Sequence, residues 1–103
     1  MRTLIDKTLH IAKERFTSFG FNETQIDALL ASAQEDLGEV LAQLQNLLED
    51  ETASAKQLGQ TLHALKGLFY NMGNTEAGDL MVELESEQNK EVIKTKIEAL
   101  MRA

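Results

Sequence analysis

The chain has 103 residues, with 17 acidic against 10 basic side chains, a net charge of −7, and neither cysteine nor proline. This length fits one domain, residues 1–103, and the missing cysteine excludes disulfides and thiolate metal sites and fits a reducing compartment. The negative charge disfavours nucleic acid and anionic membranes as partners, and no apolar run is long enough to span a bilayer. We therefore expect a cytoplasmic protein.

The composition predicts an all-α fold. Leu, Ala, Glu, Gln and Lys are abundant, whereas the β-branched and aromatic clusters that are typical of strands are lacking. Apolar residues recur at helical spacing in five segments, which predicts helices over residues 3–18, 23–49, 54–72, 75–86 and 90–102.

The ends of these helices carry recognisable signals. Gly20 stands where a left-handed residue would end the first helix, and Asn22 with Gln25 has the spacing of a capping box for the second. Ser54 with Gln57 repeats that pattern before the third helix, which Gly73 would end. The acidic stretch at residues 49–51 is interpreted as a solvated loop.

The connections between the predicted helices are short. Short connections make sequential helices run antiparallel, so the last four most simply form an up-down four-helix bundle. The helix over residues 3–18 is then an additional N-terminal helix that caps or flanks the bundle.

The third helix contains an unusual group around His63. Gly59 lies one turn before this histidine, Gly67 lies one turn after it, and Lys66 follows it at i+3. Glycine inside a helix costs about 1 kcal/mol relative to alanine, so two of them beside one imidazole call for a functional reason. On a helical wheel, His63 points away from the apolar stripe, together with Lys56, Gln60 and Tyr70, which makes this face exposed and locally basic.

An imidazole without bulky neighbours at i±4 can be approached closely by another macromolecule. Neutral imidazole is a usable nucleophile, and a nearby lysine can balance negative charge, so phosphoryl acceptance is the chemistry that suits this group. The chain lacks a glycine-rich phosphate loop and any ligand spacing for a metal, which indicates that catalytic groups come from a partner.

The segment HALKGLFYNMGNTEAGDLMVELE, residues 63–85, resembles the histidine-containing phosphotransfer (HPt) domain. The family signature is a histidine, a lysine three residues on, a glycine four on and a further glycine about ten on. His63, Lys66, Gly67 and Gly73 occupy those positions. The predicted helix order extends the resemblance over nearly the whole chain.

The resemblance implies that His63 is phosphorylated on Nε2, that Lys66 pairs with the phosphoryl oxygens, and that Gly67 leaves room for a receiver domain. Gly73 would end the helix. Family members often carry Gln or Glu about 22 residues after the histidine, bonded to its Nδ1, and Glu85 stands at that offset.

The implied partners are response-regulator receiver domains or a hybrid histidine kinase. The receiver would supply Mg²⁺, its lysine and the aspartate, so the chain itself needs no cofactor and is a phosphocarrier rather than an enzyme. We expect it to be a monomer. The initial methionine favours a freestanding protein over a fragment of a larger kinase, and we expect no removable leader.

Two alternatives remain open from the residues. A helical adaptor that docks on a receiver or kinase without being phosphorylated would share the fold, although it would not need a nucleophile on a face cleared by glycines. Tyr70 could belong to a receiver-docking surface or simply cover a neighbouring helix. His10 also precedes a lysine at i+3, but acidic residues stand at i±4, so we expect it to play no part in phosphotransfer.

Overall fold

The computed structural model describes residues 2–102 and contains five helices: α1 (Arg2–Ser18), α2 (Glu23–Glu49), α3 (Ala55–Asn71), α4 (Thr75–Glu85) and α5 (Lys90–Arg102). The described residues form no strand, so the all-α prediction is confirmed. The observed helix ends lie within one residue of the predicted ones. None of the helices in this range is both long and apolar enough to cross a membrane.

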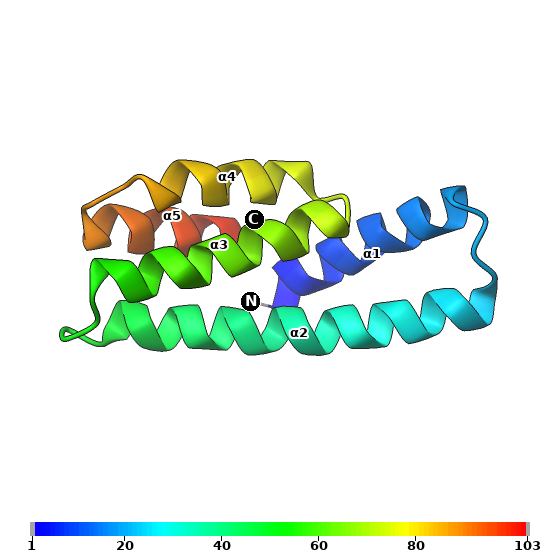
Figure 1. Ribbon diagram of the computed structural model, residues 1–103, viewed down its shortest axis with the longest axis horizontal. Helices are drawn as coiled ribbons and strands as arrows, with labels where there is room; N and C mark the ends of the chain where they lie inside the picture. The colour runs from blue at the N-terminus through cyan, green and yellow to red at the C-terminus, as the bar shows by residue number, and fades with distance from the viewer. Residues whose placement is uncertain (1, 103) are drawn as a thin grey trace.

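Helices α2 to α5 lie alongside one another along the long axis of a molecule that measures 45 × 23 × 20 Å (Figure 1). This is the predicted four-helix bundle, and α1 is the additional helix, which packs against α2 and α5. One apolar stripe from each helix fills the core. Its buried residues include Leu4, Ala12, Leu37, Leu41, Leu44, Leu58, Leu62, Leu65, Phe69, Met81, Leu84, Ile93 and Ile97.

The α1–α2 connection forms the right-hand end of the molecule in Figure 1, away from α4 and α5. Gly20 adopts a φ of +86° there, as a left-handed residue after α1 does. Asn22 and Gln25 form the predicted capping box, with Gln25 N–H donating to Asn22 Oδ1 at 2.8 Å and Asn22 N–H donating to Gln25 Oε1 at 3.0 Å. The two phenylalanines of this connection, Phe19 and Phe21, are exposed.

The turn between α3 and α4 reverses the chain in three residues. Gly73 has a φ of +86°, which permits the reversal, and Asn74 then caps α4 by accepting a hydrogen bond from Ala77 N–H at 3.2 Å. The amide of Asn74 also donates to Thr8 Oγ1 of α1 at 2.8 Å, and both side chains are buried. One asparagine therefore sets the start of α4 and ties the turn to α1.

Replacing Asn74 with alanine is expected to lower the free energy of unfolding by about 2 to 3 kcal/mol. The change removes an N-cap, which contributes about 1 kcal/mol, and deprives the buried Thr8 hydroxyl of its donor, which costs a similar amount or more. Urea unfolding followed by circular dichroism measures this loss. Asn22→Ala is the matched control, because it removes a cap in an exposed turn and should cost only about 1 kcal/mol. Equal losses in both variants would contradict the role given to the Thr8 bond.

Candidate functional site

Helix α3 presents His63 to solvent. The helix begins at a capping box in which Gln57 N–H donates to Ser54 Oγ at 3.1 Å and Ser54 N–H donates to Gln57 Oε1 at 3.0 Å. Its buried stripe, Leu58, Leu62, Leu65 and Phe69, turns the opposite face outward. The side chain of His63 on that face is 71% exposed, so the ring is accessible to another protein.

Glu85, in the last turn of α4, reaches the ring of His63. Its Oε1 lies 3.2 Å from His63 Nδ1, although the two residues are 22 positions apart. The antiparallel course of α3 and α4 after the Gly73 turn brings them together. When Nδ1 carries the proton and donates to this carboxylate, Nε2 keeps its lone pair and is the free nucleophilic nitrogen.

Lys66 contacts the same carboxylate oxygen. The distance from its Nζ to Glu85 Oε1 is 3.5 Å, and the two side chains are only 24% and 26% exposed. One acidic oxygen therefore lies next to both the histidine and the lysine of the predicted motif. The structure thus places His63, Lys66 and Glu85 in one group on the α3 and α4 surface.

The two glycines beside His63 border open space. A Cβ atom added to Gly59 or to Gly67 would have no atom within 4 Å beyond its chain neighbours and the nearby backbone of its own helix, so packing against other elements requires neither glycine. An open hollow of about 450 Å³ lies next to His63 and is lined by Lys56, Gly59, Gln60, His63 and Glu85. The predicted docking residues Lys56 and Gln60 thus share this hollow with the histidine.

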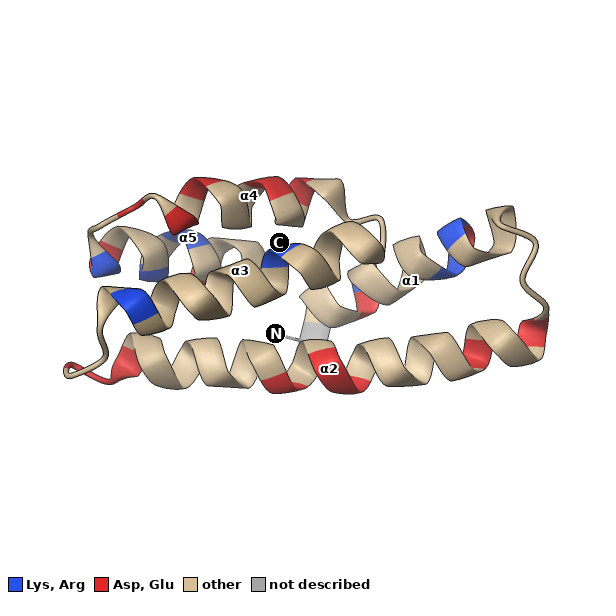
Figure 2. Ribbon diagram, in the orientation of Figure 1, with Lys and Arg blue, Asp and Glu red and all other residues tan. Residues whose placement is uncertain are grey.

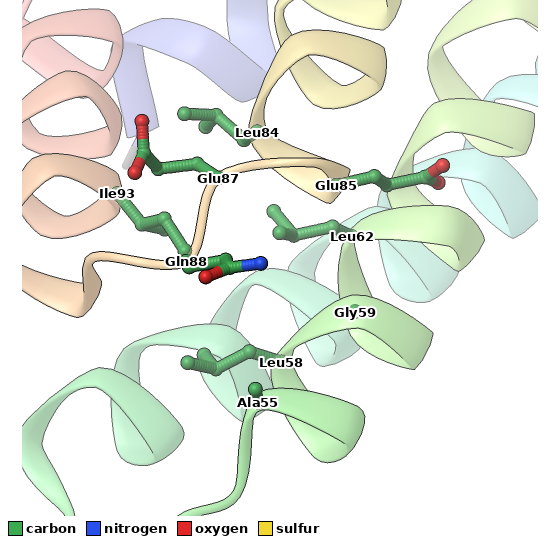
Figure 3. Close-up of a pocket in the computed structure, with 9 residues that line it drawn as sticks. All are labelled: Ala55, Leu58, Gly59, Leu62, Leu84, Glu85, Glu87, Gln88 and Ile93. Atoms are coloured by element: carbon green, nitrogen blue, oxygen red, sulfur yellow. The ribbon is translucent and has the colours of Figure 1, made fainter.

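A second, much smaller hollow lies behind Gly59, with a volume of about 20 Å³, which is room for roughly one water molecule. Figure 3 shows leucine and isoleucine side chains from α3, α4 and α5 around it, together with Glu87 and Gln88 from the α4–α5 connection, and shows the Glu85 carboxylate directed away from the leucines. Its lining residues are Ala55, Leu58, Gly59, Leu62, Leu84, Glu85, Glu87, Gln88 and Ile93. The Glu85 carboxylate therefore lies outside the small hollow, where it contacts His63 and Lys66.

The charge around His63 differs from the locally basic surface that the wheel of α3 predicts. Helix α4 lies beside α3 and contributes Glu76, Asp79, Glu83 and Glu85 without a single basic residue (Figure 2). Lys66 contacts one of these carboxylates. The surface is therefore mixed in charge, because the wheel of one helix does not include the residues of its neighbour.

Tyr70 covers helix α4. A Cβ atom on Gly78 would lie 2.4 Å from Tyr70 Cε1, so the aromatic ring occupies the space that glycine leaves, and the Tyr70 hydroxyl donates to Asp79 Oδ1 at 2.7 Å. The sequence pattern does not single out Asp79, and it leaves open whether Gly78 allows two helices to approach each other. The register that pairs His63 with Glu85 in antiparallel helices also brings Tyr70 beside Gly78 and Asp79. This register is the signal that could have identified the roles of Gly78 and Asp79.

Alkaline titration is expected to show a raised pKa for Tyr70. The hydrogen bond to Asp79 is the main cause, and desolvation and the charges of Asp79 and Glu85 add to it. Since the neutral phenol is the donor, its contribution to folding is present at neutral pH and is lost as pH rises through the raised pKa. Tyrosinate absorbance measures this cleanly, because the chain has one tyrosine and no tryptophan.

In Asp79→Ala the titration midpoint should fall towards the ordinary tyrosine value. Glu76→Ala, which removes a carboxylate from the same helix without touching this bond, should leave the midpoint near that of the parent. Identical midpoints in Asp79→Ala and the parent chain would contradict the contact.

The other histidine is remote from this group in the sequence and lies on a different helix. His10 belongs to α1, where its Nε2 lies 3.4 Å from Glu14 Oε1 and both side chains are about three-quarters exposed. Across residues 2–102, no three histidine, cysteine, aspartate or glutamate side chains gather in a way that could hold a metal ion.

Comparison with known proteins gives one result. The family model described as the Hpt domain matches residues 28–103, which covers about three-quarters of the chain and contains His63, Lys66, Gly67 and Glu85. No curated protein and no solved structure matched the chain. With its five-helix fold and this match, the chain belongs to the Hpt family, the phosphocarrier domains that act in histidine phosphotransfer in two-component signalling.

Proposed function

We propose that His63 accepts a phosphoryl group on Nε2 from the aspartyl phosphate of a receiver domain, or from a histidine kinase, and passes it to another receiver. The observation that carries this proposal is the environment of the ring. Its Nδ1 lies against the Glu85 carboxylate, its side chain is largely exposed, and an open hollow lies beside it. Nε2 is therefore the ring nitrogen free to attack an incoming phosphate.

In the transfer step, the bond from phosphorus to the receiver's aspartate oxygen breaks while the bond from phosphorus to Nε2 forms. The aspartate leaves as a carboxylate, and the proton on Nδ1 stays beside Glu85. Phosphoryl transfer depends mainly on in-line positioning and on positive charge near the phosphoryl oxygens. Lys66 supplies one such charge, and the receiver supplies Mg²⁺ and its own lysine.

The two glycines give the incoming partner room. Bulky side chains at Gly59 and Gly67 would project from the same face as His63, one turn to either side. Because a Cβ at either position would contact no side chain or backbone beyond its own turn of helix, the cleared space serves the receiver rather than the packing of the fold. Lys56 and Gln60 in the hollow and Tyr70 farther along α3 are the proposed edges of the docking surface.

The proposed site is complete within one chain, since His63, Lys66 and Glu85 all come from α3 and α4. We accordingly propose that a monomer carries the phosphoryl group. Transfer also requires the chain and its receiver to share a compartment, for which we propose the cytoplasm.

The test is to mix the purified chain with phosphorylated receiver domains and to analyse the products. We expect an acid-labile, base-stable phosphate, and tandem mass spectrometry should place it on His63. Phosphate on another residue, or none with any receiver, would overturn the proposal. Binding of a receiver without any transfer would instead favour an adaptor that docks and is not phosphorylated.

A further inference from the structure

The contact between Lys66 and Glu85 has a consequence for when the lysine can act. In the unphosphorylated chain, Lys66 Nζ lies 3.5 Å from Glu85 Oε1, the oxygen that also lies 3.2 Å from His63 Nδ1. The two nitrogens of an imidazole lie on different edges of the ring. The lysine contact is therefore made at the Nδ1 edge, whereas a phosphoryl group would be attached at the Nε2 edge.

The contact is also weak enough to be exchanged. Charge-assisted hydrogen bonds between an ammonium and a carboxylate are about 2.7 to 2.9 Å long, so a separation of 3.5 Å is a loose ion pair. Ion pairs that remain in contact with water contribute little to stability, because water screens the attraction between the two charges. The flexible stem of lysine lets its ammonium move between neighbouring acceptors without any movement of the helix.

A phosphoryl group on His63 would compete directly for this ammonium. A protein-bound phosphate carries a charge of roughly −1.5 to −2 and offers three acceptor oxygens, against a single charge on Glu85. Glu85 would keep its contact with Nδ1 after the lysine leaves. Glu85 can therefore release Lys66 while it continues to orient the ring.

We propose that Glu85 holds Lys66 at the Nδ1 edge of His63 until a phosphoryl group reaches Nε2, and that Lys66 then exchanges its carboxylate partner for the phosphoryl group. This inference rests on the proposed function. It assigns Glu85 two roles, one towards the ring and one towards the lysine. Glu85 is a positioning residue in both, since it acts through His63 and Lys66.

Glu85→Gln separates the two roles. Glutamine keeps an acceptor oxygen for the Nδ1 proton but removes the negative charge that holds Lys66. Glu83→Gln is the matched control, because it removes a carboxylate two residues earlier on α4 that pairs with Lys96 at 2.6 Å. The readout is the side-chain ammonium resonance of Lys66 in heteronuclear NMR, before and after His63 is phosphorylated chemically with phosphoramidate.

Before phosphorylation, the Lys66 resonance of Glu85→Gln should differ from that of the parent chain, whereas Glu83→Gln should move only the resonance of Lys96. After phosphorylation, the Lys66 resonances of Glu85→Gln and the parent should coincide, because both lysines then contact the phosphoryl group. The ring resonances of His63 should show the same protonated nitrogen in all three proteins.

The exchange would be overturned if the Lys66 resonances of the parent chain and of Glu85→Gln differed by the same amount before and after phosphorylation. Lys66 would then still be held by Glu85 in the phosphorylated parent chain. Identical Lys66 resonances before phosphorylation would overturn the holding contact. Phosphoramidate makes this test independent of any receiver: if receivers fail to transfer while the exchange is seen, only the proposed function fails. If neither phosphoramidate nor a phosphorylated receiver modifies His63, both proposals are overturned, because each requires a nucleophilic Nε2.

Discussion

His63→Gln is expected to abolish phosphoryl transfer from phosphorylated receivers, with labelling reduced to the level of a chain that has no acceptor. Glutamine has a comparable size and polarity, but its amide nitrogen is not a nucleophile, so no bond to phosphorus can form. The side chain is 71% exposed and lies outside the core, so the fold should be retained. Transfer is measured as acid-labile label on the chain, and circular dichroism checks the helices.

His10→Gln is the internal control for this result. His10 also has a lysine three residues on, but it lies beside Glu14 rather than between glycines. His10 should accept no more phosphate than a chain without an acceptor, so its replacement should leave phosphoryl transfer to the chain unchanged. Equal labelling of His63→Gln and the parent chain would refute the assignment of the site, and a loss of label in His10→Gln would assign it to α1.

Phe69→Ala is expected to lower the free energy of unfolding by about 3 to 5 kcal/mol. Phe69 is on the buried stripe of α3, and none of its surface is exposed. Its removal takes away apolar contacts and leaves a cavity that the surrounding helices cannot fully close. Since a domain of this size is stable by only about 5 to 15 kcal/mol, urea unfolding should show a large decrease in the midpoint.

Phe19→Ala removes the same side chain from an exposed position. Phe19 is 59% exposed and contacts mainly the ring of Phe21 and the guanidinium of Arg15. These contacts each contribute about 1 kcal/mol or less, so Phe19→Ala should lower the free energy of unfolding several-fold less than Phe69→Ala does. Comparable losses in the two variants would mean that α3 does not bury Phe69 as the structure shows.

The helices could be predicted from the sequence because their signals are local. Asn22 with Gln25 and Ser54 with Gln57 form capping boxes between residues only three positions apart, and glycine is the residue that best tolerates the φ of +86° at Gly73. The apolar stripe of α3 also determined that His63 points outward. These features follow from steric and hydrogen-bonding rules that act within one or two turns of helix.

Contacts between helices are harder to predict from the sequence than the helices themselves. The offset of Glu85 from His63 was taken from a family resemblance, and neither the shared contact with Lys66 nor the acidic flank of α4 was foreseen. The sequence leaves open whether Gly78 allows two helices to approach, and the structure shows that it makes room for the ring of Tyr70. Such contacts depend on the register and the rotation of two packed helices, and many side chains far apart in the chain set both.

Local sequence signals specify the helical class of this protein, the ends of its helices, and an exposed histidine between two glycines beside a lysine. The packing of α4 against α3 brings one carboxylate oxygen into contact with both His63 and Lys66 and places Tyr70 on α4. The two sets of features differ in the distance along the chain over which the interactions act. Helix formation and capping depend on residues that are close together in the sequence. The charge around His63 depends on how a second helix packs beside the first.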